Sequence, residues 1–323
     1  MSSSAKGAFD ELWYLEAYPD VWTAMEQGFI SSGEEHYLRF GKNEGRTLGV
    51  SHDPTKAKLL HLKDQDGPST IPAKRIERTV TDEAQCAFYH VVELEDGTVT
   101  EGQWDLRPGF DDYVGHFDFQ GKSVLEIGPA SGYLSFEMER RGAEVTAIEP
   151  PLTTLWDYVP RPTVKAKQFE REFRGHIEQV RNGFWFLHNQ KKSKVRLLEA
   201  DAYNLPSDLG RFDVGLLGSV LLHCSSPVEM IASMARRVND TIIICELFAG
   251  DLVGPTCRLV PSPGNDAMDT WWQFSPEFFV DYLGVLGFGD ARVTRHVQSL
   301  PFTNHATPLN RRLDMFTVTA HRG

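Results

Sequence analysis

The chain has 323 residues, of which 41% are hydrophobic and 24% charged, and its formal net charge is −12 at pH 7. These proportions are typical of a globular protein with one large domain and a small appendage, and the acidic charge argues against a broad nucleic-acid-binding surface. No apolar run is long enough to span a membrane, the first residues lack the pattern of a signal peptide, and the four cysteines show no CxxC spacing. We therefore expect a cytoplasmic protein with reduced thiols and no zinc site.

Residues 1–50 are predicted to form a small helical module. Phe9 begins a short aromatic helix, Pro19 suits the first position of a second helix, and residues 34–40 have the apolar spacing of a third. The pattern YPDV…EHYLRFGxxEGR resembles a short module of bacterial glycosyltransferases and cell-surface glycan proteins. A helical mini-domain that packs on the main domain or on a partner explains the same residues.

Residues 51–107 are predicted to be a polar connector followed by a β-hairpin. The runs 88–94 and 98–100 are strand-like, and the Asp-Gly pair between them is a strong hairpin signal. The segment QCAFYHVVELEDGTVTEGQWDLR at 85–107 resembles one that precedes the cofactor site in methyltransferases related to the tRNA wobble-uridine modifying type. The resemblance implies that the hairpin roofs the active site, with four side chains facing cofactor or substrate: His90, Trp104, Asp105 and Arg107. A surface hairpin with His90 and Trp104 in a packing seam is the alternative.

The main domain, residues 108–323, is organised around GKSVLEIGPASGYLSFEMERRGAEVTAIEP at 121–150. The pattern predicts, in order, a strand at 123–127, a glycine turn at 128–132, a helix at 133–141 and a strand at 144–148. Glu149 follows the second strand. Such a βαβ unit opens a doubly wound sheet, in which ligands bind beyond the carboxyl ends of the strands.

The remaining elements complete an α/β fold. A helix is expected over 108–118 and an amphipathic helix over 169–188. Further strands are expected at 195–199, 212–217 and 241–246, with a helix at 228–238. A long loop at 249–275 leads to a helix at 276–286 with Ser275 as its N-cap. Two antiparallel strands, 291–296 and 312–320, end the chain. We thus predict a Rossmann-like sheet of seven strands with helices on both faces.

Three segments resemble motifs of class I S-adenosylmethionine-dependent methyltransferases. EIGPASG fits E/D-x-G-x-x-x-G, DAYNLP follows the third strand, and GSVLLHCSSP after the fourth resembles G-V-L-Y-H-x-x-S-P. A nicotinamide or flavin site would need glycines where Ala130 and Tyr133 stand. The resemblance implies that S-adenosylmethionine is held by these residues: Glu126, Gly128, Pro129, Ala130, Gly132, Tyr133, Glu149, Asp201, Ala202 and Ser219.

Methyl transfer from a sulfonium mainly requires alignment, and a hydroxyl acceptor must also lose a proton. His223, just past the fourth strand, is the candidate base. In addition to His90, Trp104 and Arg107, three residues are predicted to face the substrate: Glu246, Trp271 and Trp272. Glu246, Asp266 and Asp269 could instead hold a divalent metal, but their spacing is not a recognised metal signature, and no metal is expected.

The acceptor is the least specified part of the prediction. We expect O-methylation of a saccharide or another small molecule, because of the glycan-associated segment, the acidic charge and the tryptophan pair. The first alternative is methylation of a tRNA base, which the missing basic stripe weakens. The second is a non-enzymatic cofactor-binding scaffold. A homo-oligomer is compatible with the sequence.

Overall fold

The computed structural model describes residues 9, 11–47, 73–94, 96–152, 157–302 and 309–323. The chain divides into two compact units, Met1–Lys58 and Leu59–Gly323, and each is described by itself. Most of the predicted connector, residues 51–72, lies outside the described residues. Among the described helices, none combines the length and the apolar character that crossing a membrane would need.

The first unit contains the three short helices that the sequence predicts. They are α1 (Glu11–Ala17), α2 (Pro19–Glu26) and α3 (Gly33–His36), which continues as a π-helical turn, η1 (Tyr37–Gly41). The carboxylate of Glu11 accepts the backbone N–H groups of Gly33 and Glu34, at 2.5 and 3.0 Å, and so caps the start of α3. Tyr14 is fully buried at the centre of this unit, and its hydroxyl lies 3.2 Å from Nδ1 of His36.

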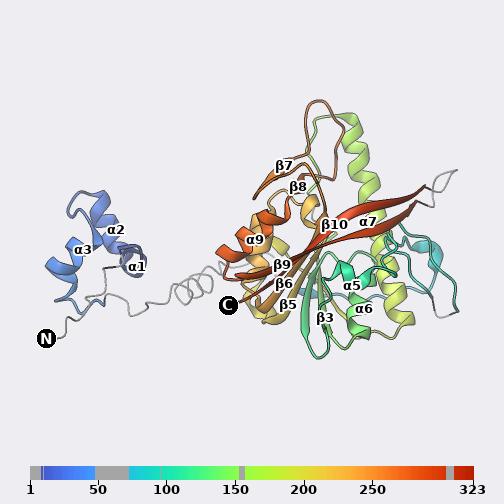
Figure 1. Cartoon of the computed structure of the whole chain (residues 1–323), viewed down its shortest axis with the longest axis horizontal. Coiled ribbons are helices and arrows are strands. Elements are labelled where there is room, and N and C mark those ends of the chain that lie inside the picture. Colours follow the sequence, from blue (N-terminus) through green and yellow to red (C-terminus); the bar gives the residue numbers. More distant parts are fainter. Residues whose placement is uncertain (1–8, 10, 48–72, 95, 153–156, 303–308) are drawn as a thin grey trace. The chain divides into compact units, whose positions relative to one another are not determined.

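The second unit is built on an eight-stranded sheet with the order β1-β4-β3-β2-β5-β6-β10-β9 (Figure 1). Strands β2 to β6 are parallel, whereas β10 is antiparallel to both β6 and β9. The seven predicted strands are present, and β1 adds a two-residue edge strand. The bounds are β1 Lys74–Arg75, β2 Ser123–Ile127, β3 Glu144–Glu149, β4 Arg196–Glu199, β5 Phe212–Gly218, β6 Val238–Leu247, β9 Asp290–Phe302 and β10 Leu309–His321.

Helices cover both faces of this sheet, as predicted (Figure 1). The helical elements are η2 Glu83–Gln85, α5 Phe110–Tyr113, α6 Tyr133–Arg140, α7 Val164–Gln190, η3 Ala202–Asn204, η4 Ser207–Leu209, η5 Leu221–His223, α8 Pro227–Ala235 and α9 Pro276–Val285. Val124 of β2 packs in the core beneath α6 and α7, whereas Leu125 and Ile127 pack beneath α8 and α9. This alternation places Glu126 on the same face as Val124, toward α6.

Several predicted bounds change. The helix expected over 108–118 shrinks to α5, because Gly115 and His116 adopt positive φ angles of 65° and 58° and end it. The helix expected at 228–238 ends at Ala235, and β6 already begins at Val238. The terminal strands are far longer than expected, because β9 and β10 pair continuously from Asp290 with His321 to Phe302 with Leu309.

Among the described residues, which leave out residue 95, the predicted hairpin before the main domain forms isolated bridges and no regular strand: Glu93 pairs with Val99, and His90 with Trp104. The turn is present, since the N–H of Leu94 donates to the carbonyl of Thr98 at 2.8 Å. Some backbone N–H groups of this segment donate to side-chain oxygens and not to the opposite strand. The N–H groups of residues 89 and 90 donate to the Ser131 hydroxyl at 3.1 and 3.3 Å.

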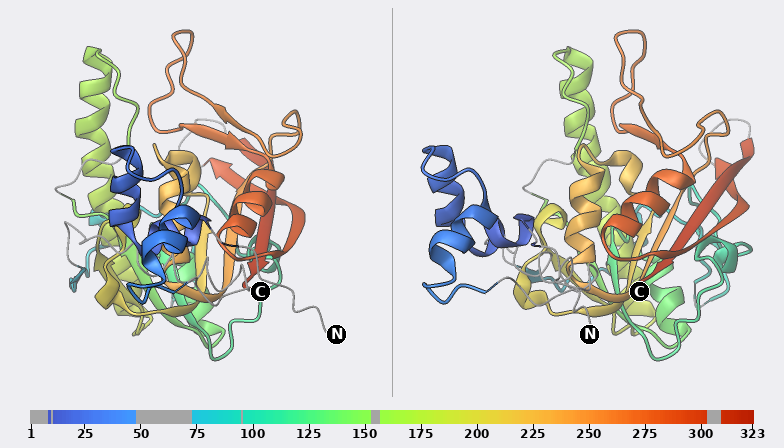
Figure 2. Two further views of the ribbon diagram at one scale, coloured as in Figure 1. Left: turned by 90° about the vertical axis from the view of Figure 1, so that its left-hand side faces the viewer. Right: turned by 60° about the vertical axis from the view of Figure 1, so that its left-hand side comes forward.

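The predicted long loop at 249–275 contains a small antiparallel sheet of β7 (Cys257–Leu259) and β8 (Trp272–Phe274). Arg161 orders the segment between them. Its guanidinium donates to the carbonyls of Ala267 and Ser262 and to Oδ1 of Asn265, at 2.9, 3.2 and 2.9 Å. This segment and the first turns of α7 rise from the same end of the sheet in every view (Figures 1 and 2).

Candidate functional site at the carboxyl ends of the parallel strands

The turn between β2 and α6 is shaped by three residues with positive φ: Gly128 at 75°, Ala130 at 49° and Gly132 at 88°. The N–H of Gly128 donates to the carbonyl of Ile148 at 3.0 Å, and that of Gly132 to the carbonyl of Pro129 at 2.8 Å. The first bond ties the turn to β3, so it lies at the carboxyl ends of both strands. A left-handed conformation at a non-glycine residue such as Ala130 is strained, and such strain is often found at ligand sites.

Glu126 lies directly below this turn and is 1% exposed. One carboxylate oxygen accepts a hydrogen bond from the Ser135 hydroxyl on α6. The other, Oε1, is buried and has no hydrogen-bond partner among the residues that the structure describes. The pKa of Glu126 is raised to about 8, chiefly by burial; the Ser135 hydrogen bond lowers it and the charge of Glu149 adds to the rise.

Glu149, the last residue of β3, is also buried, at 3% exposure. Its Oε2 lies 3.7 Å from Nη2 of Arg181 on α7 and makes no hydrogen bond within the described part of the chain. The pKa of Glu149 is raised to about 7 by burial, whereas the charge of Arg181 and the backbone N–H of Ala130 lower it. Two buried carboxylates with an unused oxygen thus lie next to the same turn.

In the segment after β4, the acidic residue Asp201 binds the backbone of its own segment. The carboxylate of Asp201 accepts the backbone N–H of Tyr203 at 2.9 Å and caps η3, while Ala202 is buried in the core. The Tyr203 hydroxyl donates to the carboxylate of Asp157. The predicted adenine contact of Asp201 is not tested by these bonds and stays a prediction.

Ser219 follows β5 with a φ of 52°. Its N–H donates to the carbonyl of Cys245 at 2.7 Å, and its hydroxyl is hydrogen-bonded to the Tyr113 hydroxyl at 3.0 Å. Tyr113 is 3% exposed, and burial raises its pKa well above the ordinary value. Its hydroxyl is therefore protonated at neutral pH.

Glu246, near the carboxyl end of β6, supports the segment that carries His223. Its Oε1 accepts the backbone N–H groups of Leu221 and Leu222, at 2.9 and 3.3 Å, and it is 1% exposed. Burial raises the pKa of Glu246 to about 8, although these N–H groups lower it. Glu246 is thus engaged with the backbone of η5, which assigns it a role in positioning that turn.

His223 is half-buried at the end of η5, and its Nδ1 lies 2.5 Å from the backbone carbonyl of Asp269. A carbonyl oxygen only accepts hydrogen bonds, so Nδ1 must carry the proton. In the neutral imidazole, Nε2 then has the free lone pair that a base requires.

Trp271 and Trp272 anchor the end of the β7–β8 segment to this turn. The indole N–H of Trp271 donates to the carbonyl of Asp157, and that of Trp272 to the carbonyl of Cys224 at 3.0 Å. The N–H of residue 271 also donates to the carbonyl of Leu222 at 2.8 Å. Their indole N–H groups are therefore bound to backbone, and Trp272 also packs against the core, so the predicted substrate contacts of both residues stay a prediction.

The segment before the main domain lies over the glycine turn, through the two hydrogen bonds to Ser131. The ring of His90 is 5.9 Å from that of Tyr133, the first residue of α6, and its Nδ1 has no partner among the described residues. Burial lowers the pKa of His90 to about 3, so the ring is neutral. Trp104 donates to the Tyr89 hydroxyl at 3.1 Å, and Arg107 forms a two-bond ion pair with Asp105.

The sequence analysis missed four residues of this region. They are Tyr89, Tyr113, Asp157 and Arg181. The charge of Glu246 contributes to the raised pKa of both Tyr89 and Tyr113, although burial is the main cause. No motif or spacing in the sequence marks these residues.

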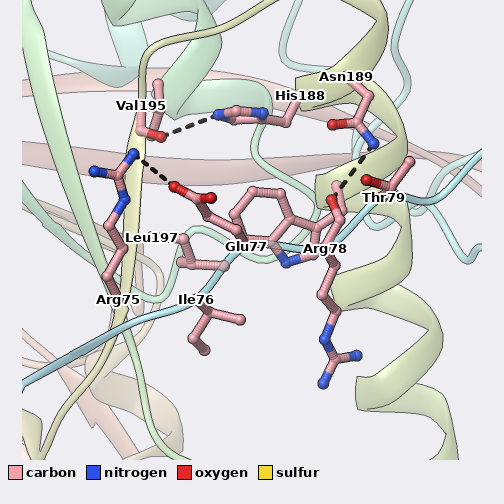
Figure 3. A pocket seen from close by; sticks show the side chains of 10 residues that line it. Arg75, Ile76, Glu77, Arg78, Thr79, His188, Asn189, Val195 and Leu197 are labelled. Atoms are coloured by element: carbon pink, nitrogen blue, oxygen red, sulfur yellow. Dashed lines mark hydrogen bonds and ion pairs between the residues drawn. The ribbon is translucent and has the colours of Figure 1, made fainter.

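A pocket of about 360 Å³ lies elsewhere, at the sheet edge (Figure 3). It is lined by residues 75–79, by one side of α7 and by the start of β4. Its polar groups largely bind one another: Arg75 pairs with Glu77 at 2.8 Å, and His188 contacts the carbonyl of Val195 at 3.1 Å. It is remote from the strand ends where the buried carboxylates and His223 lie.

Within the described residues, no three His, Cys, Asp or Glu side chains gather as metal ligands would. All four cysteines are described and are free thiols. The structure offers instead a cradle for an organic ligand. At Gly128 an added Cβ would lie 3.0 Å from the Val220 side chain, and Glu126 and Glu149, next to the same turn, each have a carboxylate oxygen without a partner among the described residues. Unused carboxylate oxygens suit an ammonium group and a pair of hydroxyls, both of which S-adenosylmethionine has.

The parallel strands, the glycine turn after β2 and the antiparallel β10 between β6 and β9 form a Rossmann-like α/β fold. The chain matches no protein-family model and no curated protein sequence. Its structure is similar to the SAH-bound N-terminal domain of EvdMO1, at 18% identity over 75% of this chain and 94% of that chain, with a TM-score of 0.44. It is also similar to 1,6-didemethyltoxoflavin-N1-methyltransferase from Burkholderia thailandensis (18% identity, 67% of this chain and 77% of that chain, TM-score 0.39). A third similar structure is magnesium protoporphyrin IX methyltransferase from Synechocystis PCC 6803 (17% identity, 64% and 76%, TM-score 0.40). At these identities the likeness concerns the fold alone.

Proposed function

We propose that this protein is an S-adenosylmethionine-dependent methyltransferase that O-methylates a saccharide or another small molecule, with His223 as the base. The observation that carries the proposal is the 2.5 Å contact between Nδ1 of His223 and the carbonyl of Asp269. Because that carbonyl can only accept, we infer that Nδ1 carries the proton, so that Nε2, on the turn held by Glu246, is the atom that would act as the base.

When bound, S-adenosylmethionine supplies a methyl group activated by a positively charged sulfur. The residues that would hold it are those around the glycine turn. Glu149 would accept its ribose hydroxyls, and the unpartnered Oε1 of Glu126 would accept a hydrogen bond from its amino group. The backbone from Gly128 to Gly132 would lie against it, with the backbone of residues 89 and 90 covering the turn through Ser131.

His223 would remove the proton from the acceptor hydroxyl through Nε2. A sugar hydroxyl is a weak acid, so a positioned base contributes on the order of 10²–10⁴-fold to the rate. The Asp269 carbonyl stabilises the imidazolium that forms, because it keeps accepting the Nδ1 proton. The buried Glu246 holds this turn through its bonds to the backbone of η5. The described residues show no bond between Glu246 and the imidazole.

Two features support a small, uncharged acceptor. The net charge of −12 disfavours the phosphate backbone of RNA. Trp271, half-buried and held by its indole bond to the carbonyl of Asp157, would suit the apolar face of a sugar or another ring. A tRNA base as acceptor and a cofactor-binding scaffold without activity are the competing outcomes of the test.

The test uses methyl-tritiated S-adenosylmethionine, the purified full chain and a bacterial extract separated into RNA, glycan-lipid and small-molecule pools. We expect label in the glycan-lipid or small-molecule pool, and a loss of at least 100-fold in His223→Ala with cofactor binding retained. His116→Asn is the matched control, because His116 is exposed and asparagine tolerates its positive φ. RNase-sensitive label would replace the proposal with the tRNA alternative, and absence of cofactor binding by the unmodified chain would reject methyl transfer altogether.

A further inference from the structure

Arg181 occupies an unusual place between two carboxylates at the ends of adjacent parallel strands. Glu149 of β3 and Glu199 of β4 are direct neighbours in the strand register. Nη1 of Arg181 donates to Oε1 of Glu199 at 3.0 Å, and Nη2 lies 3.7 Å from Oε2 of Glu149. The side chains of Arg181 and Glu149 are each 3% exposed, and that of Glu199 is 18% exposed.

The two carboxylates are treated differently by the same guanidinium. Glu199 receives a hydrogen bond, and Nη2 donates its own hydrogen bond to the carbonyl of Pro150. At 3.7 Å, Oε2 of Glu149 is beyond hydrogen-bond range but well within the range of charge attraction. Arg181 therefore compensates the charge of Glu149 and leaves that oxygen free to accept another donor.

Without a cation, the buried Glu149 would be harder to ionise beside the partly exposed Glu199, because each carboxylate raises the cost of charging the other. A protonated carboxyl would present an O–H where a diol needs an acceptor. We propose that Arg181 is a positioning residue that keeps Glu149 ionised and its Oε2 free for the ribose hydroxyls of the cofactor. This inference rests on the proposed function, since it concerns the same cofactor site.

The groups that face Glu149 set the expected pH dependence. They are Arg181 from α7, Glu199 from β4, Glu126 from β2 and the backbone N–H of Ala130 from the glycine turn. Burial raises the pKa of Glu149 to about 7, with Arg181 lowering it and Glu199 raising it. Binding that needs the ionised form weakens as pH falls through this value, by about tenfold between pH 8 and pH 6. The midpoint of this pH dependence, the pH at which half of Glu149 is ionised, should move upward when Arg181 is removed. It should move downward when the charge of Glu199 is removed.

The experiment is calorimetric titration of the full chain with S-adenosylhomocysteine from pH 6 to pH 9. We expect Arg181→Met to bind at least tenfold more weakly at pH 7 and to recover affinity toward pH 9. Arg181→Lys, which retains a cation, should lie between it and the unmodified chain. Glu149→Gln should bind weakly without this pH dependence, and Arg171→Met, an exposed arginine of the same helix, should behave as the unmodified chain.

Glu199→Gln keeps the proposal testable where Arg181→Met does not fold, because it should shift the midpoint to lower pH. A purely structural role for Arg181 predicts weaker binding at every pH with no shift of the midpoint. An unshifted midpoint in the folded Arg181 variant, or in Glu199→Gln, would overturn the inference. Failure of the unmodified chain to bind at any pH would instead overturn the proposed function.

Discussion

Gly132 provides a direct test of why the turn after β2 needs glycine. It precedes α6 with φ 88° and ψ 5°, and an added Cβ would lie 2.5 Å from Cε2 of Phe136 and 2.7 Å from Cδ2 of Phe184. Both rings belong to the core beneath α6 and α7, with centroids 5.1 Å apart, so they cannot move away freely. The structure therefore attributes this glycine to packing as well as to backbone conformation.

The expected magnitude follows from two contributions. A left-handed conformation costs a non-glycine residue about 1–2 kcal/mol, and overpacking costs about 1–3 kcal/mol more. Gly132→Ala should thus lower the free energy of unfolding by about 2–5 kcal/mol. Gly121→Ala is the matched control, because Gly121 has a φ of 71° but open space around its Cα. It should cost only about 1–2 kcal/mol.

The assay is equilibrium denaturation in urea, followed by circular dichroism, for both variants and the unmodified chain. The difference between the two variants isolates the clash with Phe136 and Phe184. Equal destabilisation by Gly132→Ala and Gly121→Ala would refute the packing argument. In that case only the backbone conformation, or access for a ligand, would account for Gly132.

Two further predictions concern buried polar groups. Folding raises the pKa of Glu126 from 4.5 to about 8, so the free energy of unfolding should fall as pH rises between these values. In Glu126→Gln, the slope of the free energy of unfolding against pH should be flatter by up to about 1.4 kcal/mol per pH unit. An unchanged slope would contradict the raised pKa. Ser275 is fully buried, donates to the carbonyl of Gly254 at 2.6 Å and accepts the N–H groups of Thr256 and Phe278 at 3.0 and 3.3 Å. Ser275→Ala should lower the free energy of unfolding by about 1–3 kcal/mol, whereas a loss below 0.5 kcal/mol, roughly that of a surface change, would show that these bonds contribute little.

The local patterns of the sequence were sufficient for the unit around the glycine turn. The strand expected at 123–127 is β2 with the same bounds, and Ser275 caps α9 as expected. Both features depend on neighbouring residues: alternating burial on a strand, and a side chain that reaches an N–H three positions away. The order of strands and helices, and the antiparallel pair at the end, follow from the same kind of pattern.

The long-range contacts were beyond such patterns. The segment 249–275 carries turn-forming residues that predict a loop, yet Arg161, about 100 positions earlier, gives it three hydrogen bonds and it contains the β7–β8 sheet. Likewise β9 and β10 extend far beyond their expected ends, because each strand supplies hydrogen-bond partners to the other whatever its own composition.

The sequence by itself determined the α/β class, the glycine turn and the residues that belong to its motifs, because these depend on interactions within a few positions of the chain. Only the tertiary structure decided which hydrogen bonds and charge contacts form between distant residues. It places Arg181 between Glu149 and Glu199, Glu246 under the backbone of η5, and His223 against the carbonyl of Asp269. The strength of a hydrogen bond or a charge pair depends on the distance between its atoms in space. Folding brings together residues that are far apart in the chain, and their separation in the sequence does not indicate that distance.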